Sequence, residues 1–477
     1  MTDGLVISVS GIRGIVGNAL TPEIVARFAA AHGAARRAAT GSKTIVVGRD
    51  ARVSGPVFVA AAEAGLRSVG CDVIDVGMAC TPTILLAVER ERAAGGIAVT
   101  ASHNPAEWNA LKLASHRGMF LTPDEGREVL AISESGRIPR ADWDELGGRQ
   151  TQPDATEFHV EAVLGTPLVD IEAVRSRGFR VVLDTCAGAG SLPVVPLLEK
   201  LGVMLEGLHL EPTGRFPRNP EPVPENLGEL CQKVREVGAD LGMAVDPDGD
   251  RLALVDEQGR AIGEDMTLAL TIDYVLGRTA SEGGSTGPVV INLSTSQVVE
   301  RVAERHGVAV VRTPVGEVNV ALGMIEAGSA IGGEGNGGVI YAPVHHTRDA
   351  PLAVGLLLSY LARWECSLSD AAGQVPRYAI AKAKLALGRV DADALLERAA
   401  EAFDSAEANR EDGLRLAWPE REEWIHLRRS GTEPVVRLIA EAPEPGRARE
   451  LLDRARELVA SLALDRTASC RDRGSAG

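Results

Sequence analysis

The 477-residue sequence lacks the features that mark nucleic-acid-binding, membrane-spanning and secreted proteins. Basic side chains are in deficit, with 50 Lys and Arg against 66 Asp and Glu and a net charge of -16, which argues against nucleic acid as a main partner. No segment approaches the roughly 18 apolar residues of a membrane helix, since the longest candidate, 352–362, is interrupted by Gly355, Ser359 and Tyr360. The start, Met-Thr-Asp-Gly, lacks the basic and apolar regions of a signal peptide.

The cysteines show no paired spacing of the kind that binds zinc. There are six of them, Cys71, Cys80, Cys186, Cys231, Cys366 and Cys470. We therefore expect reduced thiols and a cytoplasmic protein. With 45% hydrophobic residues, a chain of this length can form about three or four domains.

The first of four notable loops, residues 100–105 (Thr-Ala-Ser-His-Asn-Pro), separates two apolar, strand-like segments. The Asn-Pro pair indicates a turn, so we expect Ser102 to be displayed in the loop rather than packed. A serine in such a loop is often only a turn or cap residue. This loop alone therefore does not establish catalysis.

The second loop, residues 246–251 (Asp-Pro-Asp-Gly-Asp-Arg), also joins two strand-like segments. If the loop is tight, Asp246, Asp248 and Asp250 point at one place, where each pair of like charges about 4 Å apart repels by roughly 4 kcal/mol at an effective dielectric near 20. A hard cation removes this cost. Oxygen ligands without His or Cys favour Mg²⁺ or Ca²⁺, and so few protein ligands suit Mg²⁺ shared with a phosphate.

An EF-hand is a competing interpretation of this loop, because Glu257 falls at the twelfth position. However, Arg251 stands where the EF-hand turn needs Gly, and the flanking segments resemble strands rather than helices. A solvated acidic turn is the plainer alternative, because turns favour Asp and Gly.

The third loop, residues 332–338, reads Gly-Gly-Glu-Gly-Asn-Gly-Gly between two strand-like segments. So many glycines let the backbone approach a ligand closely, and Glu334 and Asn336 are the only side chains that can bond to it. This combination suits sugar hydroxyls. A flexible hairpin tip is the alternative.

The fourth loop, residues 428–434, reads Arg-Arg-Ser-Gly-Thr-Glu-Pro and again joins two strand-like runs. Its guanidinium groups, hydroxyls and backbone N–H groups suit a phosphate dianion, and each charge-assisted hydrogen bond contributes about 1.5 to 3 kcal/mol. Exposed arginines that only aid solubility are the alternative.

Apolar strands followed by helix-forming segments recur along the chain. The strands are expected at 44–50, 180–185 and 288–294, and the helices at 56–69, 192–201 and 296–306. Alternating signals of this kind favour α/β layers with mixed or parallel sheets. The proline-rich stretch 211–224 is expected to be a long loop within the second domain.

The four loops, together with Ser-Gly-Ile-Arg-Gly at 10–14 and Gly-Arg-Asp-Ala-Arg-Val-Ser at 48–54, resemble the α-D-phosphohexomutase superfamily, whose members move phosphate between O1 and O6 of a hexose. The resemblance implies three similar mixed-sheet α/β domains and a smaller C-terminal α+β domain, heart-shaped around a central cleft. It implies domains at 1–158 with the phosphoserine loop, 159–262 with the metal loop, 263–372 with the sugar-binding loop and 373–465 with the phosphate-binding loop, followed by a frayed tail at 466–477.

The resemblance also implies a role for each matching residue. Ser102 is expected to carry the phosphoryl group and, with Asp246, Asp248 and Asp250, to hold one Mg²⁺ per chain. The other expected catalytic residues are Lys112 as acid/base, Arg251 and Arg13 near the transferring phosphate, and His103 in an assisting role that competes with a plain backbone contact. The expected sugar ligands are Glu334 and Asn336, and the expected phosphate ligands are Arg428, Ser430, Gly431 and Thr432. A hexose 1,6-bisphosphate is the implied activator, and the protein is expected to be a monomer or homodimer.

One departure from the resemblance concerns the sugar-binding loop. Many superfamily members end this loop with Ser-Gly-His, whereas residues 336–338 here read Asn-Gly-Gly. His345 and His346 can replace the missing histidine only if the chain folds back toward the loop. The Glu-Gly-Asn-Gly-Gly pattern followed by His-Thr-Arg-Asp at 346–349 looks more like the phosphoglucosamine mutase type. Glucosamine 6-phosphate is therefore the expected substrate, with mannose or glucose phosphates as the alternative. A Mg²⁺-dependent sugar phosphatase and a non-catalytic sugar-phosphate sensor are more remote alternatives.

Overall fold

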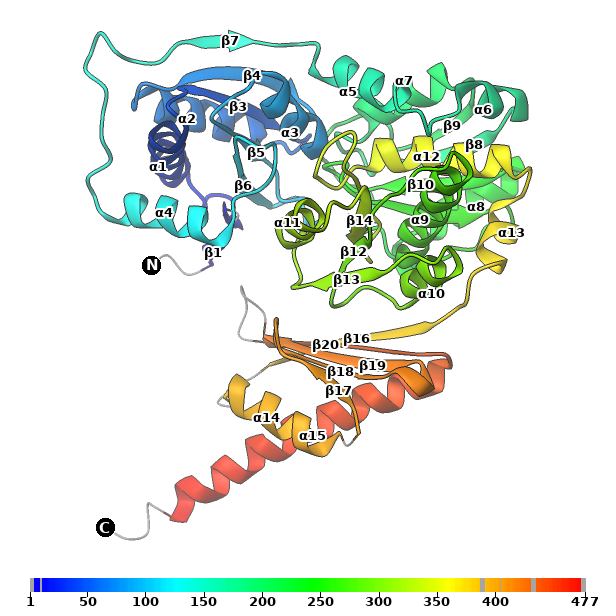
Figure 1. Ribbon diagram of the computed structural model, residues 1–477. Coiled ribbons are helices and arrows are strands. Elements are labelled where there is room, and N and C mark those ends of the chain that lie inside the picture. Colours follow the sequence, from blue (N-terminus) through cyan, green and yellow to red (C-terminus); the bar gives the residue numbers. More distant parts are fainter. Residues whose placement is uncertain (1–3, 9–10, 387–390, 404, 430–434, 473–477) are drawn as a thin grey trace.

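Four β-sheets, one in each of four domains, organise the chain (Figure 1). The computed structural model describes residues 4–8, 11–386, 391–403, 405–429 and 435–472. The first three domains contain mixed sheets and the fourth an antiparallel sheet, which confirms the predicted fold class.

Domain I is built on a seven-stranded sheet with the order β1-β2-β6-β5-β3-β4-β7. Its strands are β1 (Val6–Ser8), β2 (Gly11–Ile15), β3 (Thr44–Arg49), β4 (Asp72–Met78), β5 (Gly95–Val99), β6 (Trp108–Ser115) and β7 (Arg149–Thr151), and its helices are α1 (Pro22–Thr40), α2 (Gly55–Arg67), α3 (Thr81–Arg90) and α4 (Pro123–Glu134). Side chains alternate across β3, so Ile45 and Val47 pack with α1 and α2 while Val46 packs with α3 on the other face. Both faces of this strand are therefore buried.

Domains II and III repeat the arrangement of the central strands of domain I. Domain II contains α5 (Ala155–Leu164), α6 (Ile171–Arg177), β8 (Arg180–Asp184), α7 (Ser191–Lys200), β9 (Met204–Leu208), the 3-10 helix η1 (Pro224–Asn226), α8 (Gly228–Val237), β10 (Leu241–Val245) and β11 (Leu252–Asp256). Domain III contains α9 (Glu264–Ser281), β12 (Val289–Asn292), α10 (Val298–Arg305), β13 (Val310–Thr313), α11 (Glu317–Ala327), β14 (Ile331–Glu334), β15 (Gly338–Tyr341), α12 (Ala350–Arg363) and α13 (Leu368–Gly373).

The orders β11-β10-β8-β9 and β15-β14-β12-β13 correspond to β6-β5-β3-β4 in domain I. The predicted repetition is thus confirmed, with the predicted strands found as β3, β8 and β12 and the predicted helices as α2, α7 and α10. The stretch 211–224 follows β9 and ends at the first residue of η1, inside domain II as predicted.

Domains II and III share a hydrophobic core around α12. All residues of this helix except its last are buried, and it packs against α9 and α6. The apolar run 352–362 is therefore a helix enclosed by protein. Within the part of the chain that the structure describes, no helix is long and apolar enough to cross a membrane.

Domain IV is an antiparallel sheet with the order β16-β20-β19-β18-β17, connected to domain III through the segment after α13 (Figure 1). Its elements are β16 (Ala379–Ala386), α14 (Ala392–Ala402), β17 (Glu407–Asn409), β18 (Leu414–Trp418), the 3-10 helix η2 (Pro419–Arg421), β19 (Glu423–Arg429), β20 (Val435–Ala442) and α15 (Pro445–Asp472). The expected frayed tail from residue 466 remains a prediction, and α15 extends into that stretch as far as Asp472. Between Gly446 and Gly474 the sequence contains no Gly or Pro that would end the helix earlier.

The four loops singled out in the sequence each connect two antiparallel strands. The pairs are β5–β6, β10–β11, β14–β15 and β19–β20. In the three similar domains the hairpin occupies the same place in the strand order, although β2 and β1 extend the sheet beyond it in domain I, so the repeat presents three equivalent loops.

Candidate active site

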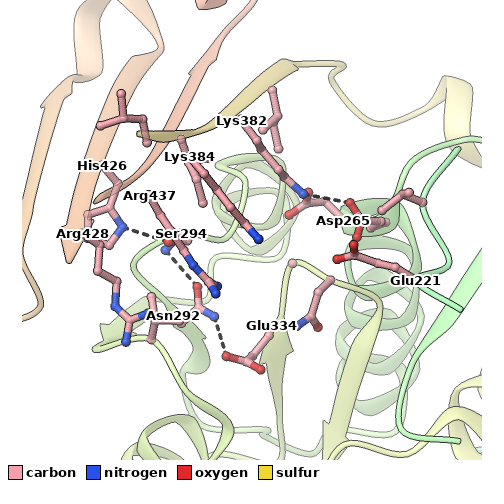
Figure 2. Close-up of a pocket in the computed structure, with 18 of the residues that line it drawn as sticks. Glu221, Asp265, Asn292, Ser294, Glu334, Lys382, Lys384, His426, Arg428 and Arg437 are labelled. Atoms are coloured by element: carbon pink, nitrogen blue, oxygen red, sulfur yellow. Dashed lines mark hydrogen bonds and ion pairs between the residues drawn. The ribbon is translucent and has the colours of Figure 1, made fainter. Parts of the chain in front are cut away.

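A cleft of about 500 Å³ is lined by residues from all four domains. His103 comes from domain I, Arg251 from domain II, Glu334 from domain III and Arg428 from domain IV. Figure 2 shows the domain IV side chains extending into this space toward Glu334. Three of the four predicted loops therefore meet at one cleft. The fourth predicted loop, residues 428–434, contributes Arg428 to the lining.

Ser102, next to the cleft residue His103, is held in an unusual conformation. Its φ of 49° lies in the left-handed region, and its backbone N–H donates to Thr100 Oγ1 at 2.9 Å. Its Oγ donates to Asp246 Oδ2 at 2.9 Å. The prediction that Ser102 is displayed is wrong, because contact with the metal loop of domain II leaves the residue only 6% exposed.

The carboxylates of Asp246, Asp248 and Asp250 meet at one place, as their alternate spacing predicts. One oxygen from each lies within 4.8 Å of the others, and all three side chains are fully buried. Because the flanking segments are the paired strands β10 and β11, the EF-hand interpretation is excluded. Burial and the other two aspartates raise the pKa of Asp246 well above its ordinary value.

Two oxygens in this group, Oδ1 of Asp248 and Oδ1 of Asp250, are buried without a hydrogen-bond donor. Unpaired buried acceptors are costly, and a cation satisfies both at once. An all-oxygen donor set with few protein ligands fits Mg²⁺, which keeps further positions for water and phosphate oxygens. The residues present thus fit the ion that the sequence predicted.

Two cations lie beside these carboxylates. Lys112 on β6 extends its Nζ to within 2.7 Å of Asp248 Oδ2 and 3.7 Å of Asp250 Oδ2. Burial alone would lower the pKa of Lys112, but the two aspartates outweigh it and raise the pKa. Arg251 lines the cleft with its Nε 3.6 Å from Asp250 Oδ1. Two of the three predicted catalytic cations, Lys112 and Arg251, are therefore at the carboxylate cluster.

His103 and Arg13, the other predicted catalytic residues, occupy different positions. His103 lines the cleft with Nδ1 3.3 Å from Ser102 Oγ, and burial and Arg251 hold its pKa well below the ordinary value. The imidazole is therefore neutral at physiological pH. Arg13 lies on β2, opposite Ala110 of the neighbouring β6.

The predicted sugar loop is shorter than expected, because β14 continues through Glu334 and leaves only residues 335–337 as the turn. Glu334 Oε1 accepts from Asn292 Nδ2 at 2.8 Å and from the Gly316 N–H at 3.1 Å. Burial opposes ionisation of Glu334, but Arg348 and Asn292 outweigh it and lower its pKa. Asn336 also lines the cleft.

Three cations form a row on the domain IV side of the cleft. Arg437 lies directly opposite Lys384 across β16–β20 and directly opposite Arg428 across β20–β19, and all three line the cleft. Like charges in directly opposed positions repel, so the row suits an anion between them. Arg428 Nε also donates to Asp412 Oδ2 at 2.6 Å. The predicted phosphate ligands Ser430, Gly431 and Thr432 lie outside the described residues.

Our sequence reasoning did not single out Lys384 or Arg437. The signal for Lys384 was the alternation in β16 (Ala-Ile-Ala-Lys-Ala-Lys-Leu-Ala), which places Lys382 and Lys384 on one face of a strand. For Arg437 no signal separated it from an ordinary strand residue.

The proposed compensation by His345 is not supported, because its ring lies away from the cleft. His345 is buried, and its Nε2 shares Asp349 Oδ2 with His159 Nε2, at 2.8 Å each. The shared carboxylate ties α5 to the segment after β15. Neither His345 nor His346 lines the cleft.

Comparisons with known proteins connect this geometry to one family. Four sequence models match: Phosphoglucomutase/phosphomannomutase, alpha/beta/alpha domain I at residues 5–138, domain II at 157–259, domain III at 263–378, and the C-terminal domain at 383–458. The chain is 38% identical to a phosphoglucomutase/phosphomannomutase of Thermococcus kodakarensis, over 93% of this chain and 96% of that one. It is also 38% identical to a probable phosphoglucosamine mutase of Methanopyrus kandleri, over 94% and 96%.

A solved structure agrees with these sequence comparisons. The crystal structure of a phosphoglucomutase/phosphomannomutase family protein from Burkholderia thailandensis superposes with a TM-score of 0.82 and 27% identity, over 96% of this chain and 98% of that one. The similarity therefore extends through all four domains and includes their arrangement around the cleft.

Proposed function

The chain belongs to the phosphoglucomutase/phosphomannomutase family of phosphohexomutases, and we propose that its own substrates are glucosamine 6-phosphate and glucosamine 1-phosphate. The enzyme is thus an isomerase that acts on hexose phosphates. The phosphatase and sensor alternatives have no support in this family. Mannose and glucose phosphates remain the alternative substrates, because the Thermococcus relative is named for them.

The observation that carries this choice is the division of charge within the cleft. Lys384, Arg428 and Arg437 form its cationic side, whereas Glu221 and Glu334 line it from domains II and III (Figure 2). Glucosamine phosphate carries a phosphate dianion and an ammonium group. Glu221 offers a carboxylate to the ammonium group while the cations hold the phosphate, and neutral glucose or mannose has no positive charge to pair with it.

Ser102 is proposed as the carrier of the phosphoryl group. Its hydroxyl already contacts Asp246, so a phosphate on Oγ adjoins the unpaired oxygens of Asp248 and Asp250. One Mg²⁺ held by these residues supplies positive charge to the transferring phosphoryl group. Arg251 adds charge from the same side, and we assign Arg13 to the phosphate as well.

Proton transfer is assigned chiefly to Lys112. The attacking sugar hydroxyl must lose a proton, and the departing Ser102 oxygen must gain one. Paired with Asp248, Lys112 holds its proton and is suited to supply it to Ser102. Neutral His103 beside Ser102 Oγ is suited to assist by accepting a proton.

The existing phosphate of the substrate is proposed to bind at Arg428, Ser430, Gly431 and Thr432, with Lys384 and Arg437 alongside. Glu334 and Asn336 then hold the ring hydroxyls in both orientations of the bisphosphorylated intermediate. If this intermediate escapes, the enzyme is left without phosphate on Ser102. A hexose 1,6-bisphosphate therefore acts as the activator.

The test compares kcat/KM for glucosamine 6-phosphate, glucose 1-phosphate and mannose 1-phosphate in the presence of Mg²⁺ and a hexose 1,6-bisphosphate. We expect glucosamine 6-phosphate to be preferred by about tenfold, the effect of roughly 1.4 kcal/mol from one charge-assisted hydrogen bond. The matched variant Glu221→Gln should remove much of this preference and leave kcat/KM for glucose 1-phosphate unchanged. A higher kcat/KM for glucose or mannose phosphate in the native enzyme would reject the glucosamine assignment.

A cytoplasmic location and a monomeric or homodimeric state remain predictions. Sedimentation velocity would determine the second.

A further inference from the structure

Arg348 contacts carboxylates from three separate elements around the active site. Its Nη2 donates to Asp250 Oδ2 at 2.5 Å, its Nη1 to Glu334 Oε2 at 2.7 Å and its Nε to Glu317 Oε2 at 3.1 Å. The residue is only 7% exposed and is not among those that line the cleft. One guanidinium thus joins the metal loop of domain II to the sugar-binding strand of domain III.

The path of this side chain depends on the glycine at position 338. A Cβ at this position would lie 2.2 Å from Arg348 Cδ, and the nearest backbone atoms are not among its three closest contacts. The φ of Gly338 lies outside the left-handed region, so its backbone would accept another residue. What Gly338 provides is therefore room for Arg348, and a side chain at 338 excludes Arg348 from this path.

Arg348 leaves one carboxylate oxygen of Asp250 without a donor and fixes the orientation of Glu334. It takes Oδ2 of Asp250 and leaves Oδ1, a buried oxygen without a hydrogen-bond donor, for a cation. Glu334 is held on both oxygens, by Asn292 and Gly316 on Oε1 and by Arg348 on Oε2, so its carboxylate orientation is determined on two sides.

Arg348 itself is oriented by Glu317 at the first turn of α11. Glu317 Oε1 accepts from the backbone N–H of Arg348 at 3.0 Å, and its Oε2 accepts from Arg348 Nε. A planar guanidinium holds its donors in a fixed fork and so fixes the directions of three carboxylates, which the freely rotating donors of an ammonium group do not. The charge of arginine also persists over the whole working pH range.

We propose that Arg348 is a positioning residue that holds Glu334 in a defined place relative to Asp250, in the space that a side chain at position 338 would occupy. This proposal rests on the proposed function, in which Glu334 binds the sugar and Asp250 binds the metal. The Asn-Gly-Gly ending of the sugar loop, where many superfamily members have Ser-Gly-His, is then explained. In this chain the side chain of Arg348, ten residues further along the sequence, occupies this space.

A double-mutant cycle with Arg348→Ala and Gly338→Ala tests the proposal. Each single variant should lower kcat/KM for the preferred hexose phosphate by about 10²-fold, the scale of a displacement of about 1 Å in a reacting group. The double variant should be no worse than Arg348→Ala, because the added methyl group has nothing left to displace. Independent, multiplying losses would overturn the proposal.

A second measurement separates positioning of the sugar from support of the metal loop. Titration calorimetry with MgCl₂ alone, without sugar, should give a Kd for Arg348→Ala no weaker than that of the native enzyme, because the variant removes a positive charge beside the ligands. A Kd that weakens in step with kcat/KM would show that Arg348 only supports the metal loop, and would overturn the proposal.

Arg36→Ala is the matched control for losing a buried arginine. Arg36 is 2% exposed, pairs with Glu125 and Glu128 in domain I, and lies away from the cleft. This variant should lower Tm and leave KM unchanged, whereas Arg348→Ala should raise KM. A native enzyme inactive on every hexose phosphate would contradict the proposed function instead. The coupling of Gly338 to Arg348 would then still be measured from Tm in the same cycle, with additive Tm changes counting against the proposal.

Discussion

Ser102 combines two properties that seldom occur in one residue, a left-handed backbone and a buried hydroxyl. A non-glycine residue in this region costs on the order of 1 kcal/mol, so neighbouring contacts must stabilise it. Thr100 accepts from its N–H and Asp246 accepts from its hydroxyl. These contacts direct the oxygen toward the carboxylate cluster, as a phosphoryl carrier requires.

We expect Ser102→Ala to abolish nearly all mutase turnover, because the variant has no hydroxyl at this position to carry the phosphoryl group. After incubation with a hexose 1,6-bisphosphate, the intact mass of the variant should show no added phosphate, whereas the native enzyme should gain one. Its Tm should stay within a few degrees of native. The control is Ser133→Ala, which removes a buried serine hydroxyl on α4 in domain I and should retain full activity. Turnover at the native rate in Ser102→Ala would contradict the proposed carrier.

At the scale of elements, Arg52 stabilises the β5–β6 hairpin loop by hydrogen bonds to its backbone carbonyls. This fully buried guanidinium donates to the carbonyls of residues 102, 104, 105 and 108, and its Nε donates to Asp50 Oδ2. The ring of Phe216, from domain II, lies 4.9 Å from its central carbon. The motif Gly-Arg-Asp-Ala-Arg-Val-Ser therefore shapes the loop that carries Ser102.

Arg52→Lys should preserve the charge and lose most of these carbonyl contacts, since an ammonium group has three donors and no planar fork. We expect phosphoryl transfer from glucose 1,6-bisphosphate to Ser102 to slow by about 10- to 100-fold in single-turnover experiments followed by intact mass. The matched variant Arg67→Lys alters an arginine that bonds to a carbonyl elsewhere in domain I, and should transfer at the native rate. Equal rates in native enzyme and Arg52→Lys would rule out this role.

At the scale of the whole molecule, domains III and IV meet through buried carboxylates. Glu441 on β20 accepts from Ser296 Oγ at 2.7 Å and from the Gln297 N–H at 3.2 Å. The neighbouring Asp265 accepts from the Ser296 N–H at 2.9 Å. Burial raises the pKa of Glu441 and of Asp265 to about 7 each. This interface therefore changes charge near neutral pH.

Between pH 4.5 and about 7 the folded protein holds a proton on Glu441 that the unfolded chain has released, so stability from this group is lost as pH rises. The free energy of unfolding falls by roughly 3 kcal/mol over this pH range. Glu441→Gln does not titrate; its amide oxygen still accepts from the Gln297 N–H, and its NH₂ group can donate to Ser296 Oγ. We expect its Tm to match native at pH 5 and to exceed it by several degrees at pH 8. Glu450→Gln, an exposed change on α15, should show no such divergence. Parallel Tm curves for Glu441→Gln and native enzyme would contradict the assignment.

Much of this molecule follows from local sequence. The recurring strands and helices predicted the three similar domains, because apolar segments of strand length between polar turns leave few other structures. The alternate spacing of Asp246, Asp248 and Asp250 predicted their convergence, since a tight hairpin turn brings such side chains together. The predicted domain limits at 158, 262, 372 and 465 remain predictions.

Only the tertiary structure decided how the loops relate to one another. The burial of Ser102 depends on Asp246 from another domain, and the row of Lys384, Arg437 and Arg428 depends on strand register across a sheet. Arg348 reaches Asp250 across 98 positions of sequence, and no local pattern encodes such a distance. The sequence by itself thus determined which chemical groups are present and on which loops. The packing of four domains determined which of them touch, because contacts between distant segments arise only when the sheets are brought together.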